Sequence, residues 1–283
     1  MAKAPEVTHN GQRMIARRDL AVQVAARAGL SPTCFRLTLT TPEPLEARPG
    51  QFGMLSCSDA FDPLLRRAFS LAGVTQTGRE TQVELLVKEV GKGTALLRRA
   101  PLGAGLRLLA PLGNGFDLGA SERPLALVAG GIGLPPVLFA AEVLARQKAR
   151  FDIYLGANTA AELLEVERCR AAAGAAGGEV VLATDDGTRG EPGFITVALA
   201  RRLAAGQAYV RVLACGPNPM LAALARLAAQ HGIAAELSLE EPMGCGVGVC
   251  LGCVVELADG HYVPACKEGP VFAASRLAER WWL

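Results

Sequence analysis

Four of the eight cysteines lie close together near the end of the chain. They follow the pattern C-x4-C-x2-C-x12-C and are Cys245, Cys250, Cys253 and Cys266. The first three have the spacing with which a loop wraps around a [2Fe-2S] cluster, and the fourth thiolate comes from further along the chain. Glycines lie beside and between them, and these are Gly244, Gly246, Gly248 and Gly252. Glycine lets the backbone turn its N–H groups toward sulfur, so the segment predicts a [2Fe-2S] cluster and electron transfer.

Four thiolates also make a closed tetrahedral zinc site, so a zinc-bearing binding module without redox function is the alternative. Zinc sites more often use two short C-x2-C pairs, and here only Cys250 and Cys253 form one. The spacing therefore favours the cluster over zinc. Three other cysteines have no partner spacing and are expected to pack as small apolar groups; they are Cys34, Cys57 and Cys169.

A glycine-rich turn lies between an apolar run and a helical pattern in the middle of the chain. The sequence LALVAGGIGLPP (125–136) places Gly130, Gly131 and Gly133 after a predicted strand and at the start of a predicted helix. A pyrophosphate can meet free backbone N–H groups and the positive end of the helix dipole at such a turn. The pattern is not G-x-G-x-x-G, and a tight structural turn is the alternative.

A second turn, CGPNPM (215–220), follows a later predicted strand. Both turns would open on the carboxyl edge of one parallel sheet, where a dinucleotide crevice forms by topology. We therefore expect Cys215, Gly216 and Pro217 to contribute to a dinucleotide site. Cys215 differs from the other unpaired thiols, because the end of its strand points into this crevice.

Two acidic residues, Asp185 and Asp186, follow another predicted strand in TDDGTRGEPGF (184–194). Their carboxylates can accept the ribose hydroxyls of a dinucleotide, although the same sequence is also typical of a plain turn. Arg189, close by, would suit the 2′-phosphate of NADP. The acidic pair favours NAD over NADP by a small margin.

The first third of the chain contains a second group of ligand-binding candidates. LLRRAFS (64–70) puts Arg67, Phe69 and Ser70 on a predicted strand. Arginine can fork onto a phosphate, an aromatic ring can cover a flavin, and a hydroxyl can reach a ring nitrogen. Core packing is the alternative for Phe69. VGKGT (90–94) is a further glycine-rich turn before a short helix, whose N-terminus could hold the pyrophosphate of a flavin.

Two kinds of secondary structure must position these residues. Short strands separated by Pro and Gly are predicted at 34–40, 52–57, 68–73, 82–90 and 106–113, with a short helix over 94–101. Their regular spacing predicts an antiparallel barrel. After Ser121, apolar strands are predicted at 125–131, 151–157, 179–186 and 210–216, and helices at 136–147, 160–172, 193–205 and 218–232. This alternation predicts a doubly wound parallel α/β domain.

The chain is thus predicted to be a multi-domain α/β plus all-β protein, in keeping with its 283 residues. We expect an N-terminal extension at 1–19, an antiparallel β-barrel flavin domain at 20–120, a nucleotide-binding α/β domain at 121–236 and a small [2Fe-2S] domain at 237–283. A β-like return within 259–272 carries the last cysteine.

Composition and charge exclude several classes of protein. The net charge of +2 and an aromatic content of 5% give neither the field nor the stacking platforms that nucleic acid needs. The first residues contain no apolar signal segment, so we expect a cytoplasmic protein with reduced thiols. Residues 124–141 are uncharged, but glycines and prolines at their centre predict a strand, a turn and a helix, and no membrane span.

Several short motifs together resemble those of the ferredoxin reductase superfamily. They are PGQF (49–52), RAFS (67–70), GKGT (91–94), GGIGLPP (130–136) and CGPNPML (215–221). The order of barrel, nucleotide domain and cysteine tail, with SLEEPMGCGVGVCLGCVV and CKEGPVF, resembles the electron transfer subunits of dihydroorotate dehydrogenase B from about Leu20 onward. In that family the subunit binds FAD and a [2Fe-2S] cluster. It passes electrons from the FMN of a separate catalytic subunit to NAD+ in pyrimidine biosynthesis, in a heterotetramer with two subunits of each kind.

The resemblance implies roles for particular residues. The implied FAD contacts are Arg67, Ala68, Phe69, Ser70, Lys88, Gly91, Gly93 and Thr94. The four tail cysteines would bind the cluster, and Gly130 to Gly133 with Cys215 would border the nicotinamide nucleotide. Phe69 replaces the tyrosine of many reductases, and Pro242 stands where the family often has an arginine that could form an ion pair. No catalytic acid or base is expected, because orotate chemistry would belong to the partner.

Two related families resemble the chain as well. One is the flavin and iron-sulfur subunit of an electron-bifurcating NADH-dependent ferredoxin:NADP oxidoreductase or sulfide dehydrogenase. Those relatives tend to carry aspartate at the first cluster position, so Cys245 favours the dihydroorotate family. The other is an oxygenase reductase with a ferredoxin domain, whose fourth cysteine usually lies much further along than Cys266 does.

Overall fold

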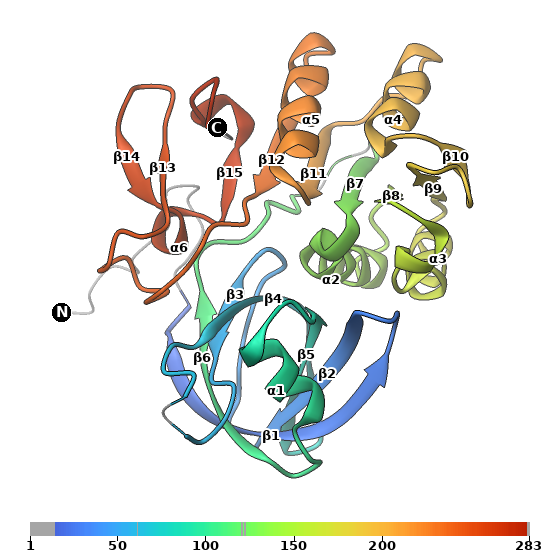
Figure 1. The fold of residues 1–283 in the computed structure, drawn as a ribbon. Coiled ribbons are helices and arrows are strands. Elements are labelled where there is room, and N and C mark those ends of the chain that lie inside the picture. The colour runs from blue at the N-terminus through green and yellow to red at the C-terminus, as the bar shows by residue number, and fades with distance from the viewer. Residues whose placement is uncertain (1–14, 61, 120, 122, 282–283) are drawn as a thin grey trace, which may run out of the picture.

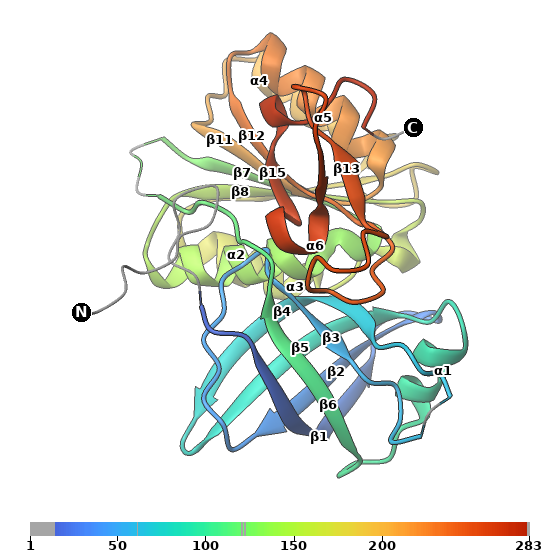
Figure 2. The ribbon, with the colours of Figure 1, turned by 90° about the vertical axis from the view of Figure 1, so that its left-hand side faces the viewer.

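The computed structural model describes residues 15–60, 62–119, 121 and 123–281. Most of the predicted N-terminal extension, residues 1–14, lies outside the described residues. Figures 1 and 2 show three parts, which are a barrel, an α/β sheet with helices, and a cysteine-bearing tail beside both. Within the described residues, every helix is too short or too polar to cross a membrane.

Six antiparallel strands close the barrel in the order β1-β2-β5-β4-β3-β6, which confirms the predicted architecture. Along β2, Phe35, Leu37 and Leu39 are buried and alternate with half-buried polar residues, as expected of a strand with one face in a core. The strands are β1 (Arg18–Gly29), β2 (Cys34–Thr41), β3 (Phe52–Leu55), β4 (Arg67–Thr77), β5 (Glu80–Lys88) and β6 (Gly105–Leu112). Helix α1 (Lys92–Arg99) follows β5.

The longest strand of the barrel, β1, was not predicted. Leu20, Val22 and Val24 alternate with exposed residues, but the pairing with β2 shifts between Val24 and Ala26. Such a β-bulge inserts one residue and breaks the period of two. The alternating pattern is therefore too short to identify the whole strand.

The second part is a seven-stranded sheet in the order β10-β9-β8-β7-β11-β12-β15. All neighbouring strands from β10 to β12 in this spatial order pair in parallel. From β10 to β7 the strand numbers fall across the sheet, and from β11 onward they rise, so the order reverses between β7 and β11. The strands are β7 (Leu125–Gly130), β8 (Phe151–Ala157), β9 (Val180–Thr184), β10 (Glu191–Pro192), β11 (Arg211–Cys215) and β12 (Ala234–Ser238). The helices are α2 (Leu134–Arg146), α3 (Val166–Ala175), α4 (Ile195–Ala204) and α5 (Asn218–Gln230), with short 3-10 turns η1 (Gly131–Gly133) and η2 (Ala160–Glu162).

Helices cover both faces of this sheet. Leu127 of β7 packs in an apolar cluster with residues of α2 and α3, whereas its neighbour Val128 packs in a second cluster with residues of α4 and α5. Strands buried on both faces are continuously apolar, which is why the sequence pattern was readable. The predicted doubly wound domain is confirmed.

The tail leaves the sheet after β12 and returns to it as β15 (Val271–Ala273), which pairs antiparallel with β12. Between them lie a small hairpin, β13 (Val254–Glu256) and β14 (Tyr262–Pro264), and the short helix α6 (Ala265–Glu268). A final 3-10 turn, η3 (Ala274–Arg276), follows β15. The predicted boundary at residue 237 falls inside β12, and β15 lies in the sheet of the nucleotide domain. The domain division stays a prediction.

The three parts share their apolar cores. Phe139 of α2 is only 3% exposed and packs among the barrel residues, and both views show α2 between barrel and sheet. In return, Ala72 and Leu86 of the barrel belong to the core of α2 and α3. Met54 of the barrel packs in the same cluster as Cys266 of the tail. Because close-packed cores deform little, these contacts hold barrel, sheet and tail in one arrangement.

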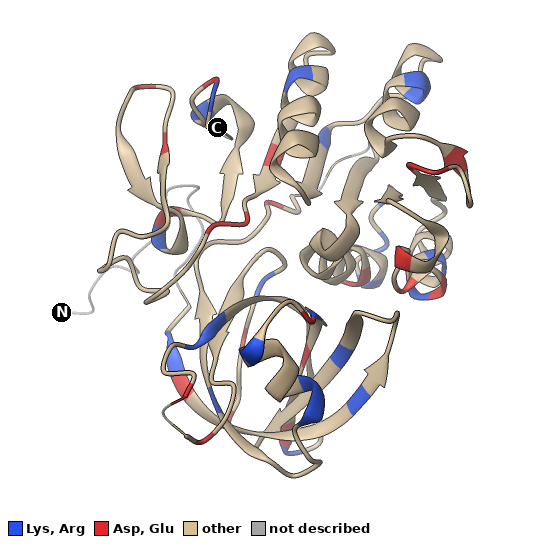
Figure 3. Ribbon diagram, in the orientation of Figure 1, with Lys and Arg blue, Asp and Glu red and all other residues tan. Residues whose placement is uncertain are grey.

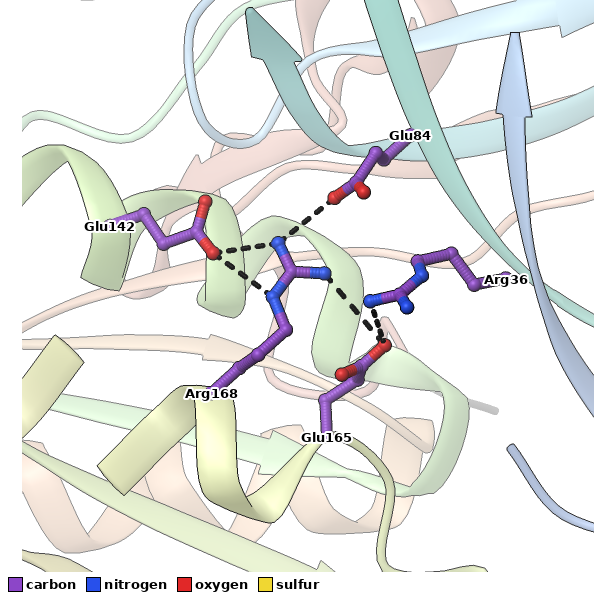
Figure 4. A network of polar contacts seen from close by, with 5 residues as sticks. All are labelled: Arg36, Glu84, Glu142, Glu165 and Arg168. Atoms are coloured by element: carbon purple, nitrogen blue, oxygen red, sulfur yellow. Dashed lines mark hydrogen bonds and ion pairs between the residues drawn. The ribbon is translucent and has the colours of Figure 1, made fainter. Parts of the chain in front are cut away.

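A network of five charged side chains spans the joint between barrel and nucleotide domain (Figure 4). Arg168 of α3 lies 2.6 Å from Glu142 of α2 and 2.9 Å from Glu84 of β5. Arg36 of β2 pairs at 3.0 Å with Glu165, which precedes α3. Burial alone would lower the pKa of Arg168, but the hydrogen bonds that it donates to Glu142 and the nearby carboxylates outweigh burial and raise the pKa above its usual value. The joint therefore combines apolar packing with charge pairing.

We predict that Phe139→Ala lowers the free energy of unfolding by about 3–5 kcal/mol, because it leaves a cavity where α2 enters the barrel core. Denaturant unfolding followed by circular dichroism measures the change. Leu102→Ala, at a side chain that is 68% exposed, is the control and should change stability by less than about 0.5 kcal/mol. Equal effects of the two substitutions would contradict the shared core.

We predict that Arg168→Met lowers the free energy of unfolding by about 2–4 kcal/mol, because it leaves the carboxylates of Glu84 and Glu142 without their cation. The loss should shrink in about 1 M salt, which screens their repulsion. Arg170→Met is the matched control on the same helix, since its pair with Glu167 is exposed. The control should cost less than about 1 kcal/mol. A loss at Arg168 that ignores salt would argue for a packing role alone.

Candidate functional site

The two predicted glycine turns meet at the point where the strand order reverses. Gly130 ends β7, and a Cβ there would lie 2.7 Å from the sulfur of Met220 in α5. A Cβ on Gly133 would lie 2.4 Å from the carbonyl oxygen of Cys215, at the end of β11. The turns are thus packed so closely that side chains are excluded. This is the switch point of an open α/β sheet, where ligands bind outside the carboxyl ends of the strands.

A cleft of about 500 Å³ opens at this edge of the sheet. Its lining includes the predicted Gly130, Gly131 and Pro217, together with Asp185. Further lining residues come from the end of β8 and the segment after it, from the start of α4 and from α5, and three come from the end of β5, the glycine turn and the segment after β12. They are Gly156, Ala157, Asn158, Glu162, Phe194, Ile195, Thr196, Pro219, Met220, Ala223, Lys88, Ile132 and Glu240.

Other predicted residues of this site lie behind the cleft. Gly133, Cys215 and Gly216 do not line it. The Cys215 side chain is 1% exposed and packs in the core formed with α2 and α3, where burial raises the pKa of its thiol. Its closeness to a nicotinamide stays a prediction.

The structure separates the two acidic residues that follow β9. Asp185 lines the cleft, whereas Asp186 closes a turn by accepting hydrogen bonds from the backbone N–H of Thr188 at 3.0 Å and from its hydroxyl at 2.7 Å. These two hydrogen bonds lower the pKa of Asp186. Arg189 is exposed and does not line the cleft. The plain-turn alternative thus describes Asp186, and a ribose contact at Asp185 stays a prediction.

A second cleft, of about 490 Å³, lies between the barrel, the start of α2 and the tail. All the residues expected to contact FAD line it, and they are Arg67, Ala68, Phe69, Ser70, Lys88, Gly91, Gly93 and Thr94. The barrel brings these residues together from β4, the end of β5 and the start of α1. Phe69 is half-buried, so it both packs against the barrel core and faces the cleft.

The glycine turn before α1 is built for a close approach. The Thr94 hydroxyl accepts a hydrogen bond from the N–H of Gly91 at 3.2 Å and holds the turn in shape. A Cβ on Gly93 would lie 2.8 Å from the sulfur of Cys57 and 3.1 Å from Nε of Arg67. The first turn of α1 carries no acidic side chain, so its unpaired backbone N–H groups and the guanidinium can receive an anion such as a pyrophosphate.

One wall of this second cleft was missed by sequence reasoning. It comes from the segment between β12 and the first cluster cysteine and from the residue before β15, and consists of Leu239, Glu240, Glu241, Met243 and Pro270. Among the described residues, three line both clefts, namely Lys88, Ile132 and Glu240. The two clefts therefore adjoin. The only sequence signal was the position of SLEEPM beside the cysteines.

The cysteine loop surrounds its sulfurs with backbone donors. The N–H groups of Val247 and Cys250 lie 3.4 and 3.5 Å from the sulfur of Cys245. The hydrogen bonds from Cys250 and Val247 lower the pKa of Cys245 to about 6, because they stabilise the thiolate. A thiolate is the form that binds metal.

The two buried cysteines are held in the same way. The N–H of Gly248 lies 3.1 Å from the sulfur of Cys266, and the N–H of Cys266 lies 3.4 Å from the sulfur of Cys253. Burial raises the pKa of Cys266 to about 12, and a metal ion bound there would remove its proton. Donors to sulfur are what an iron-sulfur cluster requires of its loop. The residues present therefore fit a cluster.

In the part of the chain that the structure describes, no three His, Cys, Asp or Glu side chains are arranged to hold a single metal ion. Zinc and a cluster both need thiolates that converge, so metal content distinguishes the two.

Two family models match the chain. The model of the iron-sulfur cluster binding domain of dihydroorotate dehydrogenase B matches residues 240–278. The oxidoreductase NAD-binding domain model matches residues 127–226. The first match contains the four cysteines, and the second contains the glycine turn and the start of α5.

Solved structures share the fold. A chain of the NADH-dependent reduced ferredoxin-NADP oxidoreductase superposes with a TM-score of 0.78 at 25% identity, over 92% of this chain and 89% of that chain. The ferredoxin reductase in carbazole 1,9a-dioxygenase superposes with a TM-score of 0.68 at 23% identity, over 81% of this chain and 70% of its own. Barrel, nucleotide domain and adjoining clefts thus define an oxidoreductase of the ferredoxin reductase type, extended by an iron-sulfur domain.

Curated relatives narrow the class. The chain is 38% identical to the dihydroorotate dehydrogenase B (NAD(+)) electron transfer subunit of Geobacillus kaustophilus, over 93% of this chain and 99% of the relative. It is 39% identical to that of Bacillus caldolyticus over the same shares. The chain belongs to the family of dihydroorotate dehydrogenase B electron transfer subunits.

We predict that Gly93→Ala weakens FAD binding at least about tenfold, which corresponds to about 1.4 kcal/mol. The added methyl would overlap Cys57 and Arg67 and displace the turn that approaches the ligand. Flavin absorbance of the dialysed protein at a series of FAD concentrations measures the affinity. Gly105→Ala, where a Cβ meets nothing within 4 Å, is the control. Full flavin content in both variants would contradict a close approach at Gly93.

Proposed function

We propose that this chain carries FAD in the barrel cleft and a [2Fe-2S] cluster on Cys245, Cys250, Cys253 and Cys266. In this role it passes electrons from the FMN of a dihydroorotate dehydrogenase catalytic subunit to NAD+, as part of pyrimidine biosynthesis. The observation that carries the proposal is the junction of the two clefts at shared residues, with the cysteine loop following directly from the wall of one of them. Family membership supports the direction and the partner.

The chain's own residues have binding and positioning tasks. When bound, FAD supplies the exchange between two-electron hydride chemistry and one-electron transfer. Arg67 and the start of α1 would hold its pyrophosphate, and Phe69 would cover its ring. The turn at Gly130 and Gly131 would receive the pyrophosphate of NAD, with Asp185 at the ribose. No acid or base is required of this chain, because the orotate chemistry belongs to the catalytic subunit.

The outer surface of the cysteine loop supports docking of the catalytic subunit. Val249 and Leu251 are 78% and 58% exposed, on either side of Cys250, which is itself exposed. The loop carries no charge, as the tan ribbon ahead of β13 in Figure 3 shows. Exposed apolar residues beside a redox ligand suit a protein contact that excludes water. We propose that two such subunits and two catalytic subunits form a heterotetramer.

A cytoplasmic location belongs to the same proposal. None of the eight cysteines, all within the described part of the chain, takes part in a disulfide. Reduced thiols are typical of the cytoplasm and are required for cluster assembly.

A second candidate function rests on the superposition with the bifurcating NADH-dependent reduced ferredoxin-NADP oxidoreductase. Cys245 at the first cluster position and the identities to the dihydroorotate family favour the first proposal. Electron delivery from the candidate partners would decide between them.

The test is the absorption spectrum of the purified chain under anaerobic conditions, before and after adding NADH. We expect flavin bands over a broad iron-sulfur envelope, with both bleached by NADH. A colourless protein that contains zinc would refute the proposal and favour the non-redox binding module.

We predict that Cys250→Ser abolishes the cluster while FAD stays bound and reducible by NADH, because the two ligands use separate residues. Iron content, electron paramagnetic resonance of the reduced protein and flavin absorbance measure the outcome. Cys34→Ala, outside the cysteine loop, is the control and should keep both cofactors. Loss of flavin together with the cluster would contradict separate sites.

A further inference from the structure

Asn114 is a buried polar residue between the barrel and the tail. It follows β6 by two residues and is only 4% exposed. It lines neither of the two clefts, and no motif or resemblance assigns it a role. A buried amide costs free energy unless its donors and acceptor are paired, so its hydrogen-bond partners show which part of the molecule it holds.

Asn114 forms hydrogen bonds with one short stretch of the tail, residues 268–271. Its Nδ2 donates to the carbonyl oxygens of Glu268 and Val271, both at 3.0 Å. Its Oδ1 accepts a hydrogen bond from the N–H of Val271 at 3.1 Å. Its own backbone N–H donates to the carbonyl oxygen of Gly269 at 2.6 Å. Both donors and the acceptor of the side-chain amide are thus directed at this stretch.

This stretch connects the cysteine loop with the flavin cleft. Cys266 lies in α6, and α6 ends at Glu268, whose carbonyl oxygen is bound by Asn114. Pro270, within the stretch, lines the flavin cleft. The carbonyl oxygen of Pro270 also accepts a hydrogen bond at 2.9 Å from the N–H of Leu239, which lines the same cleft. A shift of the stretch would therefore move a predicted cluster ligand and a wall of the flavin cleft together.

The residue before Asn114 brings the two backbones into direct contact. A Cβ on Gly113 would lie 2.5 Å from the carbonyl oxygen of Gly269 and 2.5 Å from Cδ of Pro270. The φ angle of Gly113 is 69°, in the left-handed region that favours glycine. Close packing at this point adds to the hydrogen bonds of Asn114.

The barrel holds the other side of this contact through Gln51, which precedes β3 and is 5% exposed. Its Nε2 donates to the carbonyl oxygen of Gly113 at 2.8 Å, and its Oε1 accepts from the backbone N–H of Arg48 at 2.9 Å. Its backbone carbonyl oxygen accepts from the N–H of Leu71 in β4 at 3.1 Å. Gln51 belongs to PGQF (49–52), a motif to which the proposed function gives no task. Hydrogen bonds thus run without a break from the barrel to the tail.

We propose that Asn114 is a positioning residue that fixes the cluster ligand Cys266 and the flavin-cleft wall at Pro270 in one arrangement with the barrel. This inference rests on the proposed function. Asn114 acts through residues 268–271. Without its side-chain hydrogen bonds, the buried backbone groups of that stretch lose their partners, and the stretch moves to regain them. Residues that orient metal ligands in this indirect way contribute strongly to the retention of the metal.

The experiment compares Asn114→Leu with the wild-type chain, both assembled with FAD and the cluster. Leucine keeps the branched shape of asparagine and removes every side-chain hydrogen bond. Absorbance after addition of an iron chelator, under anaerobic conditions, measures the rate of cluster loss, which we expect to rise about tenfold. Electron paramagnetic resonance of the dithionite-reduced protein should show altered g values. Titration with FAD should give a Kd raised about fivefold, because the cleft wall is displaced.

Thr81→Val is the matched control, because it also removes a buried hydrogen bond. Thr81 is 1% exposed, and its hydroxyl donates to the carbonyl oxygen of Glu43 at 2.7 Å, within the barrel. This variant should lose stability toward denaturant but change cluster loss and the Kd of FAD by less than about twofold. Cys250→Ser, which lacks the cluster, is the second reference. An unchanged Kd of FAD in that variant would show that weaker FAD binding in Asn114→Leu does not come from cluster loss.

Unchanged cluster retention and g values in Asn114→Leu would overturn the assignment, and so would equal changes in Thr81→Val. An effect on only one of the two cofactors would overturn the joint role. If Asn114→Leu does not fold, the milder Asn114→Ser decides by the same measurements, with cluster loss expected to be about threefold faster. A wild-type chain that binds neither FAD nor a cluster would instead refute the proposed function.

Discussion

The sharing of apolar cores between barrel, sheet and tail is the constraint on which the remaining structure depends. Phe139 of the nucleotide domain packs among the barrel residues, and Met54 of the barrel belongs to the same apolar cluster as Cys266 of the tail. A close-packed core transmits strain and does not slide. Neither cleft is complete within one part of the chain, so each acquires its shape only because the parts are fixed against one another. The ion pairs of Arg168 with Glu84 and Glu142 also connect α3 to the barrel and to α2 (Figure 4). Such pairs require a particular orientation of their partners, whereas apolar contacts are not directional.

Features that depend on neighbouring residues could be predicted from the sequence. The cysteine spacing, the glycine turns after β7 and β11 and the apolar strands of the sheet are all local patterns. The two turns could be placed together because parallel strands share one carboxyl edge. Strand β1 could not be predicted from local patterns, because the bulge after Val24 interrupts the alternation of buried and exposed residues. Its identity depends on pairing with two partners elsewhere in the barrel.

Features that depend on distant segments could not be predicted. Cys215 was expected at the crevice, but its side chain packs in the core formed with α2 and α3. Successive side chains of a strand point to opposite faces of the sheet, so a shift of one residue decides which face a side chain occupies. Glu240 stands in a stretch that reads as a connection, and only the approach of barrel, α2 and tail makes it part of two clefts. The different surroundings of Asp185 and Asp186 likewise arise from the shape of one turn.

The antiparallel pairing of β12 with β15 bears on how such a chain could have arisen. Everything from residue 239 to 270, including the whole cysteine loop, is formally the connection of one hairpin at the edge of an otherwise parallel sheet. Lengthening a connection costs little chain entropy, about 0.6 kcal/mol for each doubling. A redox module could therefore be gained there by insertion, with the sheet already formed. An ancestor with a plain hairpin at this edge would have lacked the one-electron branch, together with the wall of the flavin cleft that residues 239–270 supply.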